Sequence, residues 1–223
     1  MLENTMEPSE YQRRISRAYG RGSPPKDRYF LGLDLGQAND YTALAVLRES
    51  GPERGLYDLG KLERYDLGTP YPEIVASVKA MVDKLREQPA IVYLAVDATG
   101  VGRPVVDLFD EAGLSVTPIT FTSGHEVTRG EQGGYNVPKR DLVSTAKVAL
   151  QTRVLRSSPE IPLAKVFREE LLKFRVKISL KGKDTYEAWR EGDHDDLVMA
   201  VAMALWVAGQ VGPGVAIVEC HYY

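Results

Sequence analysis

The chain has 223 residues, 43% of them hydrophobic and 26% charged, which is enough for one domain with a sizeable core and short appendages. Its formal net charge of −3 does not by itself favour nucleic-acid binding, and a single cysteine, Cys220, excludes an intrachain disulfide and a cysteine-rich zinc site. There is no run of about 18 apolar residues to span a membrane, and the first residues lack the apolar stretch of a signal peptide. We therefore expect a cytoplasmic protein with no membrane partner.

Basic residues are concentrated in two segments. Residues 139–183 contain 12 Lys or Arg and 4 Asp or Glu, and residues 11–28 contain 6 basic residues and 1 acidic residue. The remainder of the chain is therefore strongly acidic. Such a distribution allows phosphate contacts beside an acidic centre, although each of these basic side chains can equally be a solvated residue on a helix face.

The first half of the chain predicts an arm, three strands and a helix. Residues 1–28 lack apolar periodicity and contain GRGSPP, which is typical of a flexible arm or an interdomain linker remnant. Strands are predicted over 29–36, 41–50 and 55–67, with a short polar turn between the first two. Apolar residues at helical spacing then predict a helix over 71–88, with Pro72 in its first turn.

The second half alternates strands and helices. A continuous apolar run over 90–100 predicts a buried strand, and a helix over 101–113 that ends at Gly113 leads to a strand over 114–121. The following elements are a glycine-rich loop over 122–137, a helix over 137–155, a helix running into a strand over 162–178, a turn at 181–184 and a hairpin strand over 185–189.

A long helix over 193–209 is apolar on nearly every side and must therefore pack against a sheet, and residues 210–223 form a tail. We expect one domain over 29–209. The order of elements predicts an α/β fold, a mixed β-sheet with three antiparallel opening strands and helices on both faces.

Acidic residues occur at three element ends. Asp34 lies near the end of the first strand, Asp97 at the end of the fourth, and Asp193, Asp195 and Asp196 at the start of the last helix. Because the carboxyl ends of such strands are where sites form, a helix laid across the sheet can bring its first turn to Asp34 and Asp97. Gly36, Gly100 and Gly102 beside them would allow a phosphate to come close, or can be ordinary turn residues.

This acidic set has the chemistry of a site for divalent cations. Mg²⁺ takes oxygen ligands, and two such ions can activate water and stabilise the leaving oxygen in phosphodiester cleavage. Asp34, on a mid-sheet strand, is the candidate bridging ligand. Asp193 and Asp196 share one helix face, whereas Asp195 points about 100° away from Asp196.

Simpler roles exist for most of these carboxylates. Asp193 can be a helix N-cap, Asp195 and Asp196 can favour the positive end of the helix dipole, and Asp97 can cap the next helix. Asp34 is harder to explain in this way, because a lone buried carboxylate is costly unless it is paired or metal-bound.

Four segments together resemble the C-terminal nuclease domain of phage terminase large subunits: GLDLGQANDYTALAV, VDATGVGRPVVDLF, VPKRDLV and HDDLVMAVAMAL. The resemblance covers roughly residues 29–209 and implies an RNase H-like fold. It also implies an endonuclease that uses Mg²⁺ or Mn²⁺, as two ions, to cut concatemeric phage DNA during genome packaging in the host cytoplasm. The implied partners are double-stranded DNA, a terminase ATPase domain, the small terminase subunit and the portal protein.

The resemblance also assigns roles to residues. Asp34 and Asp97 match the first two catalytic carboxylates, and the third falls within His194-Asp195-Asp196. Resolvases of the same fold end with an Asp-x-x-Asp pair, which Asp193 and Asp196 match, so Asp196 is favoured as the main ligand.

Basic residues are the candidates for DNA contacts. Lys139 and Arg140 match the basic start of the family's helix after the flexible loop, where they would contact phosphate. Arg129 and His125, in that loop, are weaker candidates. His194 can touch substrate or stabilise its turn.

One departure is that no GxxxxGK[ST] phosphate loop is present. We therefore expect either a nuclease domain cut from a larger protein or a separately encoded nuclease. Three alternatives stay open: a Holliday-junction resolvase, a fragment of an actin-like or sugar-kinase phosphotransferase, and a non-catalytic DNA-binding or packaging scaffold.

Overall fold

The computed structural model describes residues 27–36, 40–50, 55–100, 103–130, 133–180 and 195–212, without the side chains of 174–180. The predicted arm up to Lys26, the turn at 181–184, the strand at 185–189 and the tail beyond Gly212 lie outside these residues. So do Gly102, Asp193, His194 and Cys220. No helix within the described ranges is both long enough and apolar enough to cross a membrane.

The described residues form an eight-stranded mixed sheet in the order β6-β7-β5-β4-β1-β2-β3-β8. The strands are β1 (Asp27–Asp34), β2 (Ala43–Ser50), β3 (Leu56–Arg64), β4 (Ala90–Asp97), β5 (Thr117–Thr122), β6 (Thr128–Arg129), β7 (Tyr135–Pro138) and β8 (Leu155–Ser157). β1, β2 and β3 pair antiparallel, as predicted, while β4 pairs parallel with β1 and with β5. The α/β mixed sheet expected from the element order is confirmed.

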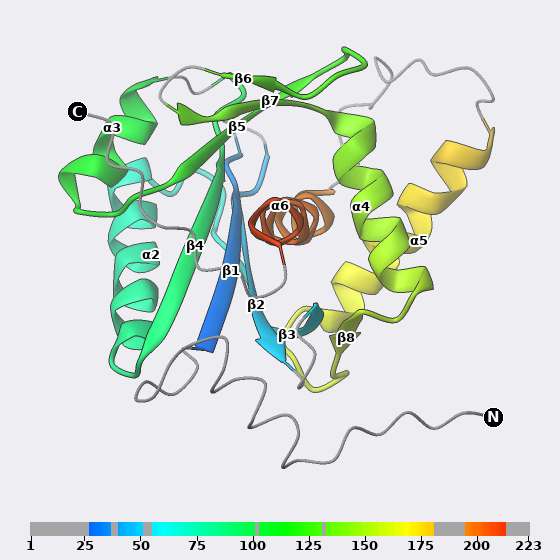
Figure 1. Cartoon of the computed structure of the whole chain (residues 1–223), viewed down its shortest axis with the longest axis horizontal. Coiled ribbons are helices and arrows are strands. Elements are labelled where there is room, and N and C mark those ends of the chain that lie inside the picture. The colour runs from blue at the N-terminus through cyan, green and yellow to red at the C-terminus, as the bar shows by residue number, and fades with distance from the viewer. Residues whose placement is uncertain are drawn as a thin grey trace.

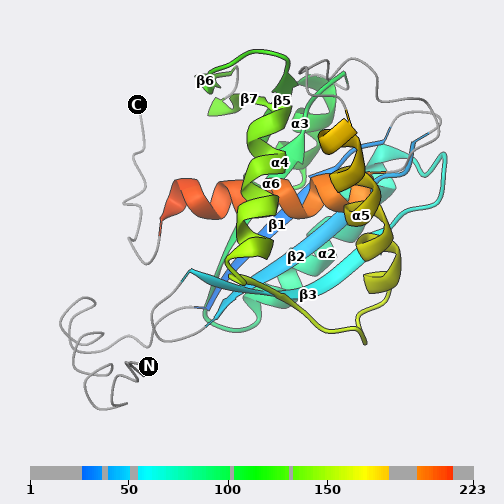
Figure 2. The ribbon, with the colours of Figure 1, turned by 90° about the vertical axis from the view of Figure 1, so that its right-hand side faces the viewer.

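Helices cover both faces of this sheet (Figure 1). They are α2 (Tyr71–Arg86), α3 (Arg103–Glu111), α4 (Lys139–Gln151), α5 (Ala164–Leu180) and α6 (Asp196–Val211). α2 and α3 lie on one face, and α6 lies on the other, where it crosses β1 and β2 beneath α4 (Figure 2). α5 packs beside α4 and α6 on that second side.

The alternation of side chains along β1 explains the two layers. Leu31 and Leu33 point into the core beneath α2 and α3, whereas Phe30 points into the core that contains α6. Because both faces are covered, the central strands are apolar at nearly every position. α6 is buried at every residue from Asp196 to Ala208, as its all-round apolar sequence predicts.

Several local signals were confirmed. Pro72 lies in the first turn of α2. Gly113 ends the segment after α3 with a φ of 73°, and its N–H donates to Asp110 O while Leu114 N–H donates to Phe109 O. A positive φ of this kind suits glycine, so the signal has a physical basis.

Three expectations in the second half were wrong. The predicted loop over 122–137 contains β6 and β7, which are too short to show strand periodicity. The predicted helix over 137–155 ends at Gln151, because Arg153 takes a φ of 58° and Leu155 starts β8. α5 runs on as helix to Leu180, where the sequence predicted a strand.

Candidate active site

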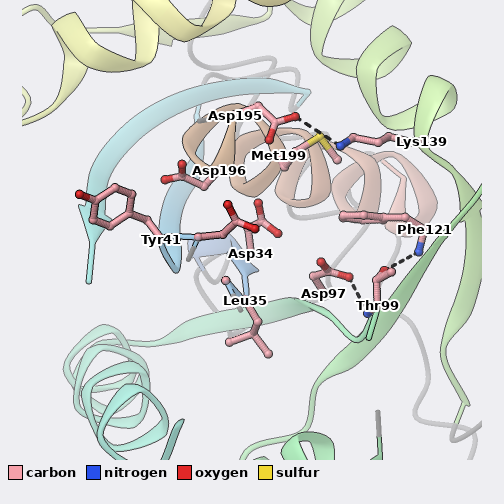
Figure 3. A pocket seen from close by; sticks show the side chains of 12 residues that line it. Asp34, Leu35, Tyr41, Asp97, Thr99, Phe121, Lys139, Asp195, Asp196 and Met199 are labelled. Carbon is pink, nitrogen blue, oxygen red and sulfur yellow. Dashed lines mark hydrogen bonds and ion pairs between the residues drawn. The ribbon is translucent and has the colours of Figure 1, made fainter. Parts of the chain in front are cut away.

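Two strand ends and one helix start meet at the same edge of the sheet. Asp34 ends β1 and Asp97 ends β4, and the parallel register that pairs Leu33 with Val96 puts these two aspartates side by side. α6 begins over them, with Asp195 at its N-cap and Asp196 as its first residue. The predicted convergence of distant acidic residues therefore occurs in the structure (Figure 3).

These carboxylates line a pocket of about 320 Å³. Its other lining residues are Leu35, Gly36, Asp40, Tyr41, Thr99, Phe121, Lys139 and Met199. Tyr41 and Phe121 lie on opposite sides of the acidic group (Figure 3). A second hollow of about 200 Å³ shares Gly36 and Asp40 with the pocket and extends to the turn before α2. The site is therefore an acidic cleft with one extension.

Burial acts on both strand carboxylates, and the charges of neighbouring carboxylates act on Asp34 as well. Burial raises the pKa of Asp34 well above its usual value, and the charges of Asp97, Asp195 and Asp196 raise it further, while Lys139 lowers it. Burial also raises the pKa of Asp97 to about 6, against the lowering effect of hydrogen bonds from Thr99. Carboxylates held together in this way gain from an added positive charge.

Thr99 fixes the orientation of Asp97. Its backbone N–H donates to Asp97 Oδ1 at 2.7 Å, and its hydroxyl oxygen accepts the Phe121 N–H at 2.8 Å. A hydroxyl can accept one hydrogen bond and donate another. The side-chain hydrogen bond from Thr99 lowers the pKa of Asp97. Asp97 thus orders the turn that follows β4.

Basic side chains hold the carboxylates of α6. Lys139 Nζ lies 3.3 Å from Asp195 Oδ2, and Arg64 Nε donates to Asp196 Oδ2 at 2.7 Å. Arg64 also donates through Nη2 to Glu170 on α5. Asp195 was the less certain ligand from the sequence, and in the structure it lines the same pocket as Asp196.

The other predicted DNA contacts lie at the β5–β7 end of the sheet. Arg140 donates through Nη2 to the His125 backbone oxygen at 2.8 Å, and its Nη1 lies 2.5 Å from His125 Nδ1. Arg129 lies over the Tyr135 ring, 4.4 Å from its centroid. Of these candidates only Lys139 lines the pocket itself. Asp193 and His194 lie outside the described residues, so their roles stay predictions.

The sequence did not reveal Arg64, Glu170 or Thr99 as site residues. The strand pairing could have pointed to Arg64. Arg64 pairs with Ala43 of β2, and Ala43 pairs with Asp34 of β1, so the three residues form one row across the sheet. Thr99 stands two residues after Asp97, where an Asx-type turn was foreseeable. Nothing in the sequence around Glu170 places α5 against the start of α6.

The donor chemistry of the pocket fits a hard divalent cation. Asp34, Asp97, Asp195 and Asp196 supply only oxygen atoms, and repulsion among them raises the Asp34 pKa. No group of three or more His, Cys, Asp or Glu side chains, within the part of the chain that the structure describes, is already spaced to hold one ion. Arg64 and Lys139 instead hold the two α6 carboxylates. The residue types therefore fit a metal, and small side-chain movements would be needed to bring them around it.

Neither a protein-family model nor a curated protein sequence matches this chain. Solved structures do match. The large terminase nuclease from thermophilic phage G20c gives a TM-score of 0.52 at 22% identity, covering 81% of this chain and 82% of that one. A structure of the same nuclease with bound zinc gives 0.51 at 23% identity, covering 81% of each. The chain has the fold of the large terminase nucleases.

Two further structures share this terminase-nuclease fold. The human cytomegalovirus terminase nuclease domain, soaked with Mn and with an inhibitor bound, gives a TM-score of 0.53 at 14% identity, covering 81% of this chain and 82% of that one. The HK97 bacteriophage large terminase gives 0.50 at 15% identity, covering 83% of this chain and 40% of that one. The terminase-nuclease fold implied by the four sequence segments is therefore confirmed.

Proposed function

We propose that this chain is a divalent-metal-dependent DNA endonuclease that cuts phage DNA during genome packaging. One observation carries the proposal: Asp34, Asp97, Asp195 and Asp196 come from three separate elements and line one pocket. Terminase nucleases that share the fold have been crystallised with zinc or soaked with manganese, which supports a divalent cation as cofactor.

Asp34, Asp97 and Asp196 would hold the metal as the catalytic carboxylates, with Asp34 as the candidate bridging ligand. Mg²⁺ or Mn²⁺ bound there would activate water and stabilise the leaving oxygen. Asp34 is suited to bridging because it ends a strand at the centre of the sheet, paired with Ala43 of β2 and directly after the last residue of β1 that pairs with β4. Asp195 and Asp193 are the remaining candidate ligands.

Basic residues beside the pocket would place the phosphate backbone. Lys139, the first residue of α4, lines the pocket, and Arg140 follows it in the first turn, so both can contact phosphate without reading sequence. Arg129 and His125 would extend this contact along the β5–β7 side, and His194 is a further candidate for a contact with the substrate. The proposed substrate is double-stranded DNA, and the proposed partners are a terminase ATPase domain, the small terminase subunit and the portal protein in the host cytoplasm.

Nicking of supercoiled plasmid tests the proposal. We expect conversion to the open circle and then to the linear form in Mn²⁺ or Mg²⁺, and no conversion in excess EDTA. Equal cleavage in EDTA would overturn the metal dependence. DNA binding with no cleavage in any divalent cation would overturn the nuclease function and favour a scaffold role. Strong preference for four-way junctions over linear duplex would instead identify a resolvase, and ATP-dependent phosphorylation of a sugar would identify the kinase alternative.

A further inference from the structure

Arg64 joins two carboxylates that belong to different helices. Its Nε donates to Asp196 Oδ2 at 2.7 Å, and its Nη2 donates to Glu170 Oε1. The three side chains are 17%, 8% and 6% exposed for Arg64, Asp196 and Glu170. Because a guanidinium carries its donors in one rigid plane, this arginine fixes the two carboxylates relative to each other.

The sheet brings Arg64 to this point. Arg64 ends β3 in the same cross-strand row as Ala43 of β2 and Asp34 of β1, and so lies on the face that α6 covers. Its guanidinium lies 4.9 Å from the centroid of the Tyr41 ring. Tyr41 and Asp196 line the pocket, whereas Arg64 does not. Arg64 therefore holds Asp196 from behind the pocket wall.

Glu170 contacts the first turn of α6 as well as Arg64, because the backbone N–H of Val198 donates a hydrogen bond to its carboxylate. It is buried on α5, and within the described ranges its Oε2 has no hydrogen-bond partner. Burial and the charge of Asp196 raise its pKa to about 7, although Arg64 lowers it. A buried acid beside another acid costs free energy, and a buried ion pair is often no better for stability than apolar residues of similar size. Stability alone therefore does not account for the arrangement.

We propose that Arg64 and Glu170 are positioning residues for Asp196, holding its Oδ2 so that the rest of the carboxylate faces the pocket. This inference rests on the proposed metal-dependent nuclease function. Carboxylates that bind metals are themselves usually hydrogen-bonded, and losing such an outer partner typically lowers metal affinity by about 10- to 100-fold.

Loss of the Arg64 charge and loss of the Arg64 geometry would change the metal affinity in opposite directions. A positive charge beside a cation site weakens binding, so loss of the charge alone would tighten it. Arg64→Lys keeps the charge but cannot bridge Asp196 and Glu170 in one plane. If Arg64 positions Asp196, Arg64→Lys weakens metal binding, whereas a mere neighbouring charge would leave the affinity of that variant unchanged.

The test is a titration of the full chain with Mn²⁺ alone, with free Mn²⁺ measured by electron paramagnetic resonance. We expect Arg64→Lys to bind Mn²⁺ about 10-fold more weakly than wild type. Glu170→Gln should change the affinity in the same direction. The matched controls are Arg156→Lys, at an exposed ion pair with Asp58, and Glu169→Gln, one residue away on the exposed side of α5, and both should bind like wild type.

A double variant separates positioning from folding. Arg64→Met with Glu170→Met removes the Arg64–Glu170 pair as a unit, although Asp196 then loses its Arg64 partner, so a urea transition is measured to establish that the variant is folded under the conditions of the titration. It should nevertheless show the same loss of Mn²⁺ affinity. Wild-type affinity in both Arg64→Lys and the double variant would overturn the positioning role while leaving the nuclease proposal intact. Failure of the wild type to bind Mn²⁺ or to nick DNA would overturn both.

Discussion

Gly32 of β1 lies directly against Ala200 of α6, so close that a β-carbon at residue 32 would stand 2.0 Å from the Ala200 carbonyl oxygen. The same β-carbon would stand 2.9 Å from Ala204 N, so it would meet backbone that cannot rotate away. Two residues further along β1 is Asp34, and four residues back along α6 is Asp196. The absence of a side chain at Gly32 therefore sets how closely the two acidic elements approach.

Gly32→Ala should displace α6 from the sheet and destabilise the protein. Overpacking against backbone predicts a loss of about 3 kcal/mol in the free energy of unfolding, measured by urea denaturation. Gly60→Ala is the matched control, because a β-carbon there meets only Val46 O at 3.7 Å, and it should change stability by less than about 0.5 kcal/mol. Equal stability of the two variants would show that α6 can shift without cost.

The sequence predicted those parts of the fold that depend on local periodicity. β1, α2, β4 and α6 each carry an apolar pattern long enough to define an element, and Asp34 and Asp97 follow because they end two of the strands. The parallel pairing of β1 with β4 then brings the two aspartates together, as the rule for carboxyl ends of strands predicts.

The rest depends on contacts between elements that no local pattern encodes. β8 has three residues and exists because it pairs with β3, and α4 ends where Arg153 takes a positive φ without any glycine to announce it. Glu170 reaches Arg64 only because α5 packs beside α6. Such residues become visible only when the tertiary arrangement is known.

Asp34→Asn should abolish nicking without loss of the fold. The amide has nearly the same volume but cannot supply the bridging charge, so activity should fall by more than the roughly 100-fold that loss of an outer partner costs. The metal-free variant should also melt at a higher temperature than metal-free wild type, because the substitution removes a buried carboxylate that lies near three others. Asp83→Asn, on the exposed side of α2, should nick like wild type. Full activity of Asp34→Asn in Mn²⁺ would contradict the assignment.

Thr99→Val should move the pH dependence of nicking to higher pH. The substitution keeps the side-chain volume but removes the hydroxyl that lowers the Asp97 pKa, so that pKa should rise above about 6. It also leaves the Phe121 N–H without its acceptor, at a cost of about 1–3 kcal/mol. Thr99→Ser should restore both the profile and the stability. A profile that does not differ between wild type and Thr99→Val would show that the hydroxyl does not act on Asp97.

The metal-free protein should lose stability as the pH rises. Asp97 has a pKa of about 6 against its usual value of 3.8, and Glu170 about 7 against 4.5. Between the usual and the raised pKa of each group, the folded state keeps a proton that the unfolded state has released. The free energy of unfolding therefore falls with rising pH. Urea denaturation in EDTA at several pH values should therefore show a decline over about pH 4 to 7, on the order of 3 kcal/mol for Asp97.

Two comparisons check the source of this decline. Asp97→Asn cannot titrate, so its stability should depend less on pH than that of wild type between about pH 4 and 6. Adding Mn²⁺ should stabilise wild type most at the upper end of the range, since the ligands must be deprotonated to bind the ion. A decline that is as steep in Asp97→Asn as in wild type would assign the effect to other groups.

Arg140→Gln should weaken DNA binding equally for all sequences. Arg140 lies in the first turn of α4, next to the pocket-lining Lys139, and bonds to His125, so its guanidinium is a candidate contact for a backbone phosphate beside the pocket. Loss of one phosphate contact releases about one counterion fewer, so the slope of log affinity against log salt should fall in magnitude by about 1. Fluorescence anisotropy of labelled duplexes, in EDTA to prevent cleavage, measures that slope. Arg48→Gln, at an exposed ion pair with Asp27 near the opposite end of β1, should keep the wild-type slope, and an unchanged slope in Arg140→Gln would exclude a phosphate contact there.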